Sequence, residues 1–414
     1  MLPIATADHR GAAFADSLFT SVSAVCVTGL VVRDTASYWS VFGQAVILVL
    51  IQIGGMGVIT VAVAIFTASG KKISLKQRST MQEAICAHKV GGIVRLTGFI
   101  IKMTILCEVS GAVIIAPSFC REFGLGKGIW YAVFHSVSAF CNAGFDLMGV
   151  REPYSSLTGF ADNWTVNLGI MALIVTGGIG FMTWDDIKTN RHRLRRYRMQ
   201  SKVILTSTCL LILIPAWYFF FFEFSDVPLS RRIQLSVFQS VTPRTAGFNT
   251  ADLNRLSENG RALMILLMLI GGSPGSTAGG MKTTTFAVLV CTAVSVFRHR
   301  EHTHFFGRRI DDETVRNAVA VLTMYLVLFL GGGFVISCRE GIPLLESLFE
   351  TASAVATVGL TLGITPNLSL LSRGILILLM YVGRVGGLTL IFAALSGSKH
   401  GCTIRFPQEK ITVG

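Results

Sequence analysis

Four short segments of the chain share one order of residue types: a Phe, then small and hydroxyl side chains, then a glycine followed by a large apolar residue. Glycine tolerates the backbone angles that turn successive carbonyl groups toward one side. Carbonyl oxygens arranged in this way can replace the water shell of a dehydrated cation. One such glycine would indicate only a tight turn or a helix-packing contact, but four copies in register favour a cation pathway. The copies read LFTSVSAVCVTGL from residue 18, VFHSVSAFCNAGF from 133, VFQSVTPRTAGF from 237 and LFETASAVATVGL from 348.

The glycines of these segments are 115, 103 and 112 residues apart, which is room for a helix in, a short re-entrant helix, an extended glycine segment and a helix out. Thr28, Asn142, Thr245 and Thr357 can add side-chain oxygen or brace the loops. The fourth copy has the Thr-Val-Gly start of the potassium-channel filter, whereas the others keep only the glycine, so we expect fewer well-formed ion sites than in a tetrameric channel. The expected filter and potassium-binding residues are Cys26, Val27, Thr28, Gly29, Cys141, Asn142, Ala143, Gly144, Thr245, Ala246, Gly247, Thr357, Val358 and Gly359.

A glycine-rich stretch at 271–285 interrupts an apolar span that starts near Ala262. Its five glycines and one proline each cost a helix about 1–3 kcal/mol relative to Ala, so we expect an intramembrane loop just below the filter. A phosphate-binding loop is the competing interpretation. It is disfavoured because Met281 separates Gly280 from Lys282 and because the preceding segment is a membrane span rather than a strand.

Arg384 lies about 20 Å into the last apolar span, at 1.5 Å per helical residue. A charge at that depth usually faces a cavity or a partner, and carbonyl groups of the 271–285 loop are plausible acceptors. We hypothesise a gate in which the loop plugs the pore; the alternative is a purely structural brace. Lys282 either shares this role or extends to the inner surface. The residues assigned to the gate are Gly271, Gly272, Ser273, Pro274, Gly275, Ser276, Thr277, Ala278, Gly279, Gly280, Lys282 and Arg384.

Four other ionisable residues in apolar segments receive no transport role. Lys102 and Glu108 are six residues apart and therefore lie on different faces of a helix. His135 and Glu350 occupy equivalent positions in two of the short helices, where we expect local hydrogen bonds rather than a proton relay.

The elements that must position these residues are membrane spans. Hydrophobic residues make up 51% of the 414 residues and charged residues only 14%, against about a quarter in soluble domains. A span needs roughly 20 apolar residues. Seven stretches qualify, some of them interrupted by single charges: 35–70, 90–118, 163–184, 203–222, 262–297, 317–338 and 371–397.

The net charge of +13 is unevenly distributed. Of the 36 Lys and Arg residues, 21 lie in the segments 71–95, 188–202, 298–316 and 399–410. This excess on alternate loops predicts that these four segments are cytoplasmic. It argues against nucleic-acid binding, because no binding module surrounds the arginines of 191–198. The nine cysteines show no CxxC pair. Five of them lie among apolar or small residues and are expected to be small buried side chains rather than ligands or disulfides: Cys26, Cys107, Cys141, Cys209 and Cys291.

The predicted fold is therefore all-α and integral to the membrane, with four tandem helix–pore loop–helix repeats around a pseudo-fourfold pore. The first repeat is expected to lack its first helix, through a truncation or a misassigned start. The expected boundaries are 1–70 for repeat one, 71–187 for repeat two, 188–297 for repeat three, 298–398 for repeat four and 399–414 for a cytoplasmic tail.

The four segments, the loop GSPGSTAGGMKT and the sequence GRVG at 383–386 together resemble the superfamily of Trk, Ktr and HKT potassium transporters, and most of all the KtrB-type membrane subunits of Ktr systems. This resemblance covers essentially the whole chain. It implies a homodimer in the plasma membrane and a cytosolic regulatory ring of the KtrA type that binds ATP, ADP or NAD, so that any nucleotide is held by the partner subunit. It also implies potassium uptake driven by the membrane potential and often dependent on sodium, with Gly29, Gly144, Gly247 and Gly359 selecting potassium and 271–285 with Arg384 forming the gate.

The sequence disfavours two other classes of protein. A sodium-coupled carrier with alternating access would show inverted repeats, whereas these four repeats run in the same orientation. An enzyme would need a cluster such as HExxH, a nucleophile elbow or paired carboxylates, and no such cluster is found. We therefore expect no catalytic residues, no covalently bound cofactor and no metal other than the transported ion.

Overall fold

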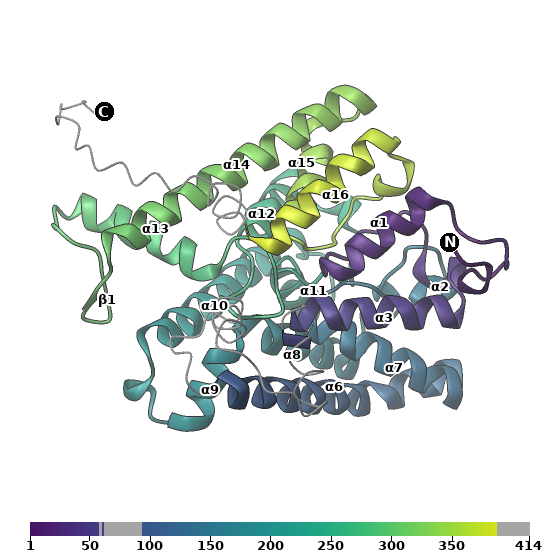
Figure 1. The fold of residues 1–414 in the computed structure, drawn as a ribbon, viewed down its shortest axis with the longest axis horizontal. Coiled ribbons are helices and arrows are strands. Elements are labelled where there is room, and N and C mark those ends of the chain that lie inside the picture. The colour runs from purple at the N-terminus through teal and green to yellow at the C-terminus, as the bar shows by residue number, and fades with distance from the viewer. Residues whose placement is uncertain (58–59, 62–92, 387–414) are drawn as a thin grey trace.

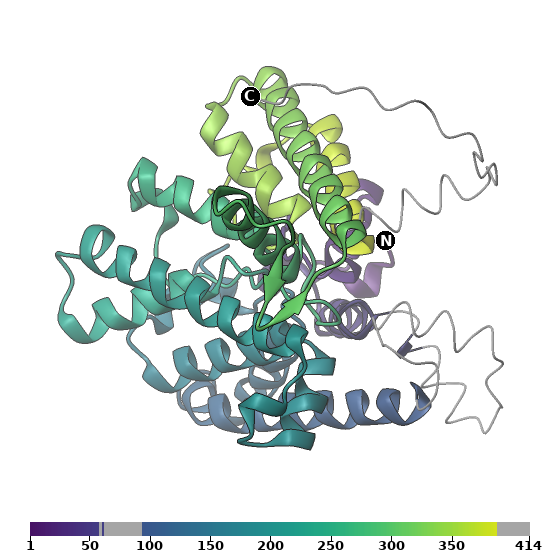
Figure 2. The ribbon, with the colours of Figure 1, turned by 90° about the vertical axis from the view of Figure 1, so that its left-hand side faces the viewer.

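The protein folds almost entirely into helices, as expected. The computed structural model describes residues 1–57, 60–61 and 93–386. Within these ranges the only sheet is the two-residue pairing of β1 (His304–Phe305) with β2 (Arg308–Arg309). Seen from the β1–β2 end, the purple, blue, teal and green-to-yellow parts of the chain occupy successive sectors around a common centre (Figure 2).

Each of the four glycine segments follows a short helix whose carboxyl end points into the molecule. These short helices are α1 (Phe14–Val25), α7 (Leu125–Phe140), α11 (Leu229–Val241) and α15 (Leu344–Val355). Longer helices precede three of them: α6 (Ile93–Phe123), α10 (Met199–Tyr218) and α14 (Asp312–Glu340). A further helix follows each glycine segment: α3 (Val41–Met56), α8 (Trp164–Ile179), α12 (Glu258–Leu269) and α16 (Leu370–Val385).

Shorter elements complete the described chain (Figure 1). They are η1 (Pro3–Ala5), α2 (Thr35–Tyr38), η2 (Met148–Val150), η3 (Thr158–Phe160), α9 (Phe181–Asn190), η4 (Leu194–Arg196), the π-helical turn η5 (Phe219–Glu223), η6 (Leu253–Arg255), α13 (Thr283–Phe297) and η7 (Thr365–Asn367). Helix starts are set by polar caps, because free backbone N–H groups need acceptors. The side-chain oxygens of Asp34, Ser40, Asn163 and Ser257 accept these bonds at α2, α3, α8 and α12.

Three helices among the described residues are long and apolar enough to cross a bilayer: Val94–Phe123, Met199–Glu223 and Asp312–Glu340. The pair α8–α9 would be a fourth if it were counted as one bent span, and α1, α3 and α13 are apolar but shorter. The prediction of an unbroken span at 163–184 is wrong, because the axis turns by 94° between α8 and α9. Gly180 allows this turn with φ of +95°, an angle that other residues rarely adopt.

Three of the other predicted spans are also shorter as helices than as apolar stretches. The stretch 35–70 contains α2 and α3, and the stretch 371–397 contains α16; the rest of each lies largely outside the described residues. The stretch 262–297 is divided by a non-helical segment between α12 and α13.

The core is centred on the four short helices. Each carries a Phe at the same place in the repeated pattern, and all four of these rings are fully buried: Phe19, Phe134, Phe238 and Phe349. The large apolar residues that follow the glycines are buried as well: Leu30, Phe145, Phe248 and Leu360. These anchors fix both ends of every glycine segment, so that the segment itself is held between packed side chains.

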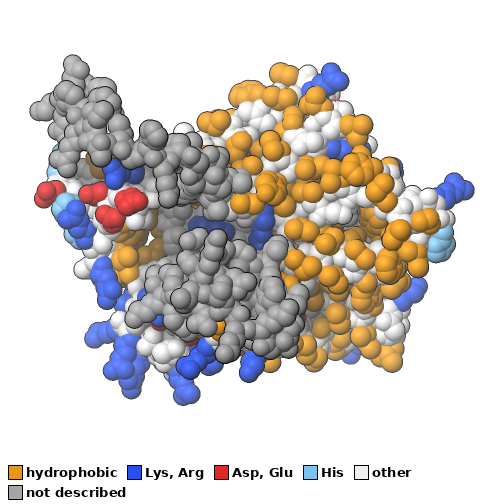
Figure 3. All heavy atoms as spheres, in the orientation of Figure 1, with side chains coloured by type: hydrophobic (Ala, Val, Ile, Leu, Met, Phe, Trp, Pro, Cys, Tyr) orange, Lys and Arg blue, Asp and Glu red, His pale blue; other side chains and the backbone are white. Residues whose placement is uncertain are grey.

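The surface divides into an apolar part and a basic end. Hydrophobic side chains cover most of the right-hand half of the molecule in Figure 3, whereas Lys and Arg gather at the left-hand end, around α9 and the β1–β2 hairpin. The arginines of the 191–198 segment are largely exposed at this end. The distribution is that of a protein with an apolar membrane-facing belt and one strongly basic aqueous face.

Candidate functional site

The four glycine segments adopt the same unusual backbone. In each, the residue two before the glycine has a positive φ: 56° at Val27, 58° at Asn142, 67° at Thr245 and 52° at Thr357. The glycines follow with φ of 93°, 69°, 79° and 92° at Gly29, Gly144, Gly247 and Gly359. Branched residues such as Val and Thr rarely adopt this region, so the surrounding structure must hold them there.

The four glycines meet in a closed ring. If a Cβ atom were added to any one of them, it would collide with the carbonyl oxygen that precedes the next glycine in the chain, and the last glycine would collide with the first loop. These contacts join Gly29 to Ala143, Gly144 to Ala246, Gly247 to Val358 and Gly359 to Thr28. The added atoms would lie 3.0–3.3 Å from the Cα of the neighbouring glycine. We call these four residues the glycine ring.

The remaining predicted filter residues are the chain neighbours of these glycines in the four segments. Cys26, Thr28, Cys141, Ala143, Ala246 and Val358 are buried. Two of the polar residues bond across units, because Thr245 Oγ1 donates to the side-chain oxygen of Asn142 at 3.2 Å. Thr357 lies against Gly279 of the 271–285 loop. The structure therefore brings all fourteen predicted filter residues into one place.

Four buried hydroxyl groups brace the glycine segments, and sequence reasoning missed them. Ser23 and Ser353 accept bonds from the N–H groups of Gly29 and Gly359, at 3.1 and 3.0 Å. Ser138 and Thr242 instead donate to the carbonyl groups of Phe145 and Phe248, at 2.7 and 2.5 Å. A signal existed, since each brace occupies the same place in the repeated pattern, five or six residues before its glycine.

The 271–285 loop lies against the carboxyl ends of the short helices. Two backbone hydrogen bonds join the beginning of the loop to its end. The Gly271 N–H donates to the Met281 carbonyl at 2.8 Å, and the Thr283 N–H donates to the Gly272 carbonyl at 3.0 Å. Farther along, Thr277 Oγ1 donates to the Phe140 carbonyl at the end of α7, 3.0 Å. The loop also docks on the end of α8, where the Phe181 N–H donates to its Gly275 carbonyl at 2.8 Å.

Arg384 joins three elements. Its guanidinium group donates to the carbonyl of Thr277 in the loop and to the carbonyls of Gly54 and Gly55 at the end of α3, the last at 3.3 Å. The residue itself belongs to the last turn of α16. The contacts place the positive charge between the loop and two of the four units, where it can either brace the loop or control its position.

Lys282 faces the loop rather than the basic end. Its Nζ donates to the Ala278 carbonyl at 2.8 Å, which closes a turn within the loop. This contact does not favour extension of the ammonium group to the inner surface.

A second set of glycines lies at the ends of the helices that follow the glycine ring, and sequence reasoning singled out only the copy at 383–386. Gly57, Gly180 and Gly386 end α3, α8 and α16 with φ of 84°, 95° and 86°. Three residues earlier, Gly54, Gly177 and Gly383 lie against the last carbonyl group of the short helix in the same unit. The sequences GGMG, GGIG and GRVG at these places carried the signal.

The other ionisable residues singled out in the sequence lie on α6, α7 and α15. Glu108 is buried and its Oε1 lies 3.9 Å from Cys141 Sγ, whereas Lys102 is exposed on another face of α6. The buried His135 accepts from the Leu147 N–H at 3.3 Å, and Glu350 accepts from Thr361 and from Thr365, the latter at 3.0 Å. The bonds of His135 and Glu350 are local, as expected.

An ion-pair network missed from the sequence ties the first unit to the fourth. The carboxyl group of Asp16 is only 6% exposed and accepts from Arg33 Nε at 2.9 Å and from Arg373 Nη1 at 3.0 Å. Arg373 also donates to the Pro366 carbonyl at 2.8 Å. Elsewhere, the described part of the chain holds no group of three or more His, Cys, Asp or Glu side chains that could bind a metal ion.

A helical chain with an apolar belt, a basic aqueous face and a closed ring of backbone loops at its centre defines the class of multi-pass membrane proteins that carry ions. Comparison with known proteins agrees, because a family model described as TrkH, cation transport protein, matches residues 4–400. The chain belongs to this TrkH/Ktr family, which consists of transport proteins rather than enzymes.

Characterised relatives cover the full length of the chain. It is 38% identical to the potassium/sodium uptake protein NtpJ of Enterococcus hirae and 38% identical to the Ktr system potassium uptake protein B of Bacillus subtilis; each match covers 100% of this chain and 92% of the relative. Among solved structures, the potassium transporter TrkH from Vibrio parahaemolyticus is similar, with a TM-score of 0.73 at 20% identity over 93% of this chain and 79% of that one. This likeness shows that the fold is shared.

Proposed function

We propose that this protein takes up potassium across the plasma membrane through a selective, gated, channel-like pore. The observation that carries the proposal is the glycine ring, in which four non-helical backbone segments from one chain meet inside an apolar protein. Backbone that is not helical at membrane depth must be buried in protein or line a watery path. Rings of backbone carbonyl groups are also the known means by which proteins replace the hydration shell of a potassium ion.

The relatives support potassium as the ion. Both of the relatives with 38% identity are described as uptake proteins for potassium, one of them also for sodium. We propose that Cys26–Gly29, Cys141–Gly144, Thr245–Gly247 and Thr357–Gly359 form the filter. The repeats at 1–70, 71–187, 188–297 and 298–398 would then each contribute one quarter of the pore.

The 271–285 loop and Arg384 are proposed as the gate below this filter. The loop contacts Thr357 and the end of α7, so it lies beside two of the four filter segments. Arg384 holds it there through the Thr277 carbonyl. Opening would require the loop to move away and these bonds to break, which makes Arg384 the residue that sets the closed position.

The proposed subunit assembly is also based on the relatives. Ktr systems have more than one component, and we propose that this chain forms a homodimer that contacts a KtrA-type cytosolic ring, with any regulatory nucleotide bound by that ring. The basic face around α9 and the β1–β2 hairpin is the end at which such a ring would bind (Figure 3).

The function is tested by expressing the chain in a bacterium that lacks potassium uptake and growing it at low external potassium, with and without sodium. Growth restored by the wild-type chain supports potassium uptake, and a sodium requirement would define the coupling. Failure of a well-expressed, membrane-inserted protein to restore growth or to accumulate rubidium contradicts the proposal.

Purified protein in vesicles separates a pore from a carrier. Vesicles loaded with potassium and diluted into low potassium should take up tracer rubidium without any sodium gradient, because a pore needs only the electrochemical gradient of the ion. Uptake that appears only with an inward sodium gradient would instead favour an alternating-access carrier.

A further inference from the structure

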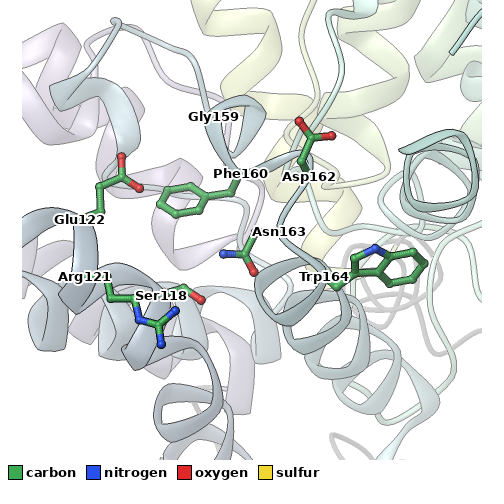
Figure 4. Close-up of a pocket in the computed structure, with 8 residues that line it drawn as sticks. All are labelled: Ser118, Arg121, Glu122, Gly159, Phe160, Asp162, Asn163 and Trp164. Atoms are coloured by element: carbon green, nitrogen blue, oxygen red, sulfur yellow. The ribbon is translucent and has the colours of Figure 1, made fainter. Parts of the chain in front are cut away.

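A polar pocket lies at one end of the α6–α8 pair, far from the glycine ring. Its volume is about 720 Å³, and it is open to the surface. It is lined by Ser118, Arg121, Glu122, Gly159, Phe160, Asp162, Asn163 and Trp164 (Figure 4). These residues come from the last turns of α6, the first residues of α8 and the turn before it.

The depth of this pocket follows from the two helices. α6 enters from the 71–95 segment, which is predicted to be cytoplasmic, and crosses the bilayer, so its end at Phe123 lies at the opposite surface. Trp164, at the start of α8, is 42% exposed, and Trp is typical of the membrane–water boundary. The pocket is therefore at the level of lipid head groups in the outer leaflet.

The pocket has separate positive and negative sides. In Figure 4, Arg121 and Ser118 lie toward the bottom, the carboxyl groups of Glu122 and Asp162 lie toward the top, and Asn163 lies between them. Arg121 forms no ion pair within the described part of the chain. The Oδ1 of Asn163 already caps α8, by accepting from Thr165 and Val166 N–H groups, which leaves its NH₂ group to face a ligand.

The carboxyl groups retain capacity for a cation. Glu122 is paired with Arg151, and Asp162 is paired with Arg231 Nε at 3.4 Å. A carboxylate offers about four lone-pair sites, so one guanidinium partner leaves room for an ammonium group. An ammonium group can use these free oxygen sites, whereas a phosphate group cannot.

An apolar strip continues from the pocket along both helices. Ile114 is one turn before Ser118 on the same face of α6, and Leu168 is one turn after Trp164 on the same face of α8. They are 50% and 52% exposed. Between them, Gly169 has no side chain and packs on Ile115, so the surface between the two helices forms a shallow depression. An acyl chain fits such a surface.

We propose that this pocket and strip bind a membrane phospholipid of the outer leaflet whose head group carries both a phosphodiester and an ammonium group, as in phosphatidylethanolamine. Arg121, with the hydroxyl group of Ser118 and the amide of Asn163, holds the phosphate. Glu122 and Asp162 hold the ammonium group, and an acyl chain lies over Ile114 and Leu168.

The test is native mass spectrometry of the delipidated full-length protein, titrated separately with phosphatidylethanolamine, phosphatidylcholine and phosphatidylglycerol of identical acyl chains, and with inorganic phosphate. We expect phosphatidylethanolamine to bind best. Arg121→Ala should weaken its binding about tenfold, the equivalent of one charge-assisted bond, while Arg121→Lys should keep part of it. The matched control is Arg255→Ala, an arginine whose side chain is 87% exposed and lies outside the pocket.

The double variant Glu122→Gln and Asp162→Asn should remove the preference for phosphatidylethanolamine over phosphatidylglycerol. Thermal unfolding of each variant verifies that it is folded. Equal lipid binding by Arg121→Ala and wild type would overturn the proposal. So would preferential binding of phosphatidylglycerol to the wild type, or displacement of the lipid by inorganic phosphate at equal concentration, which would indicate a simple anion site.

Discussion

At Gly359 the space that a side chain would need is occupied by the backbone of another unit. An added Cβ would meet the Thr28 carbonyl and lie 3.0 Å from Gly29 Cα, and the φ of 92° is one that other residues rarely adopt. Space and backbone angle therefore both require glycine. A larger residue must displace a loop whose carbonyl groups are proposed to face the ion.

The substitution Gly359→Ser should weaken discrimination of potassium from sodium. Backbone strain of about 1–3 kcal/mol is relieved by a shift of the carbonyl groups, and we therefore expect the ratio of the two ions to fall about fivefold or more. The measurement is rubidium uptake into vesicles under competition by sodium. Gly331→Ser is the matched control, because Gly331 on α14 has no neighbour within 4 Å of its Cβ position. An unchanged permeability ratio for Gly359→Ser would count against the filter.

The hydroxyl braces make a second prediction for single residues. Replacing Ser353 by Ala leaves the buried N–H of Gly359 without its acceptor, which costs about 1–3 kcal/mol. We expect a lower unfolding temperature and weaker stabilisation by potassium in a thermal scan. Ser110→Ala, at an exposed position on α6, should change neither. If both variants melt alike, the brace contributes nothing measurable.

At the scale of elements, the glycine segments and the non-helical 271–285 loop could be predicted from the sequence because both carry dense local patterns. The repeated Phe, hydroxyl and glycine positions are visible within a dozen residues, and five glycines with one proline exclude a helix. The bend at Gly180 could not be predicted from the length and hydropathy of 163–184. Its cause is tertiary, since the 271–285 loop docks on the end of α8.

The Asp16 network illustrates the same limit for long-range contacts. Arg33 is 17 positions from Asp16 in the chain and Arg373 is 357 positions from it. Nothing local in the sequence indicates that these residues meet. The ends of the helices, in contrast, could have been predicted from the sequence. The motifs GGMG, GGIG and GRVG follow the glycine ring at similar distances and can be aligned. Arg384 would then have been recognised as the position that departs from glycine.

The loop itself is the element to remove in a test of gating. A protein lacking residues 274–280 should conduct rubidium faster than wild type, because the plug below the filter is gone. Arg384→Met should act in the same direction, by about tenfold or more, since charge-assisted bonds of about 1.5–3 kcal/mol hold the closed position. Arg339→Met, at an exposed site on α14, is the control. Flux equal to wild type in both altered proteins would leave the loop as a structural brace.

At the scale of the whole molecule, the outer contacts hold the units in sequence around the centre. The Tyr154 N–H donates to Asp34 at 3.0 Å between the first two units, and the Leu157 N–H donates to the Asn249 carbonyl at 2.9 Å between the next two. Asp16 and Arg373 join the last unit to the first. These outer contacts join the first unit to the second, the second to the third and the fourth to the first, while backbone contacts between the glycines close the ring at its centre.

Removing the contact between Asp16 and Arg373 should destabilise the folded chain. Asp16→Asn should lower the free energy of unfolding by about 2–3 kcal/mol, less than for a fully buried pair because Arg33 is half exposed. Asp252→Asn is the matched control, since Asp252 pairs with Arg255 at an exposed site and should cost less than about 0.5 kcal/mol. Thermal unfolding in detergent measures both. Equal losses would show that Asp16 does not close the ring.

Because one polypeptide supplies all four quadrants, a substitution enters the ring once, whereas in an assembly of identical subunits it would enter four times. The quadrants are therefore free to diverge: the third continues from α12 through the 271–285 loop into α13, and the fourth replaces a small residue by Arg384. With the proposed filter and gate, ion preference and opening would be adjusted by separate mutations in separate quarters of the protein, each with a graded effect.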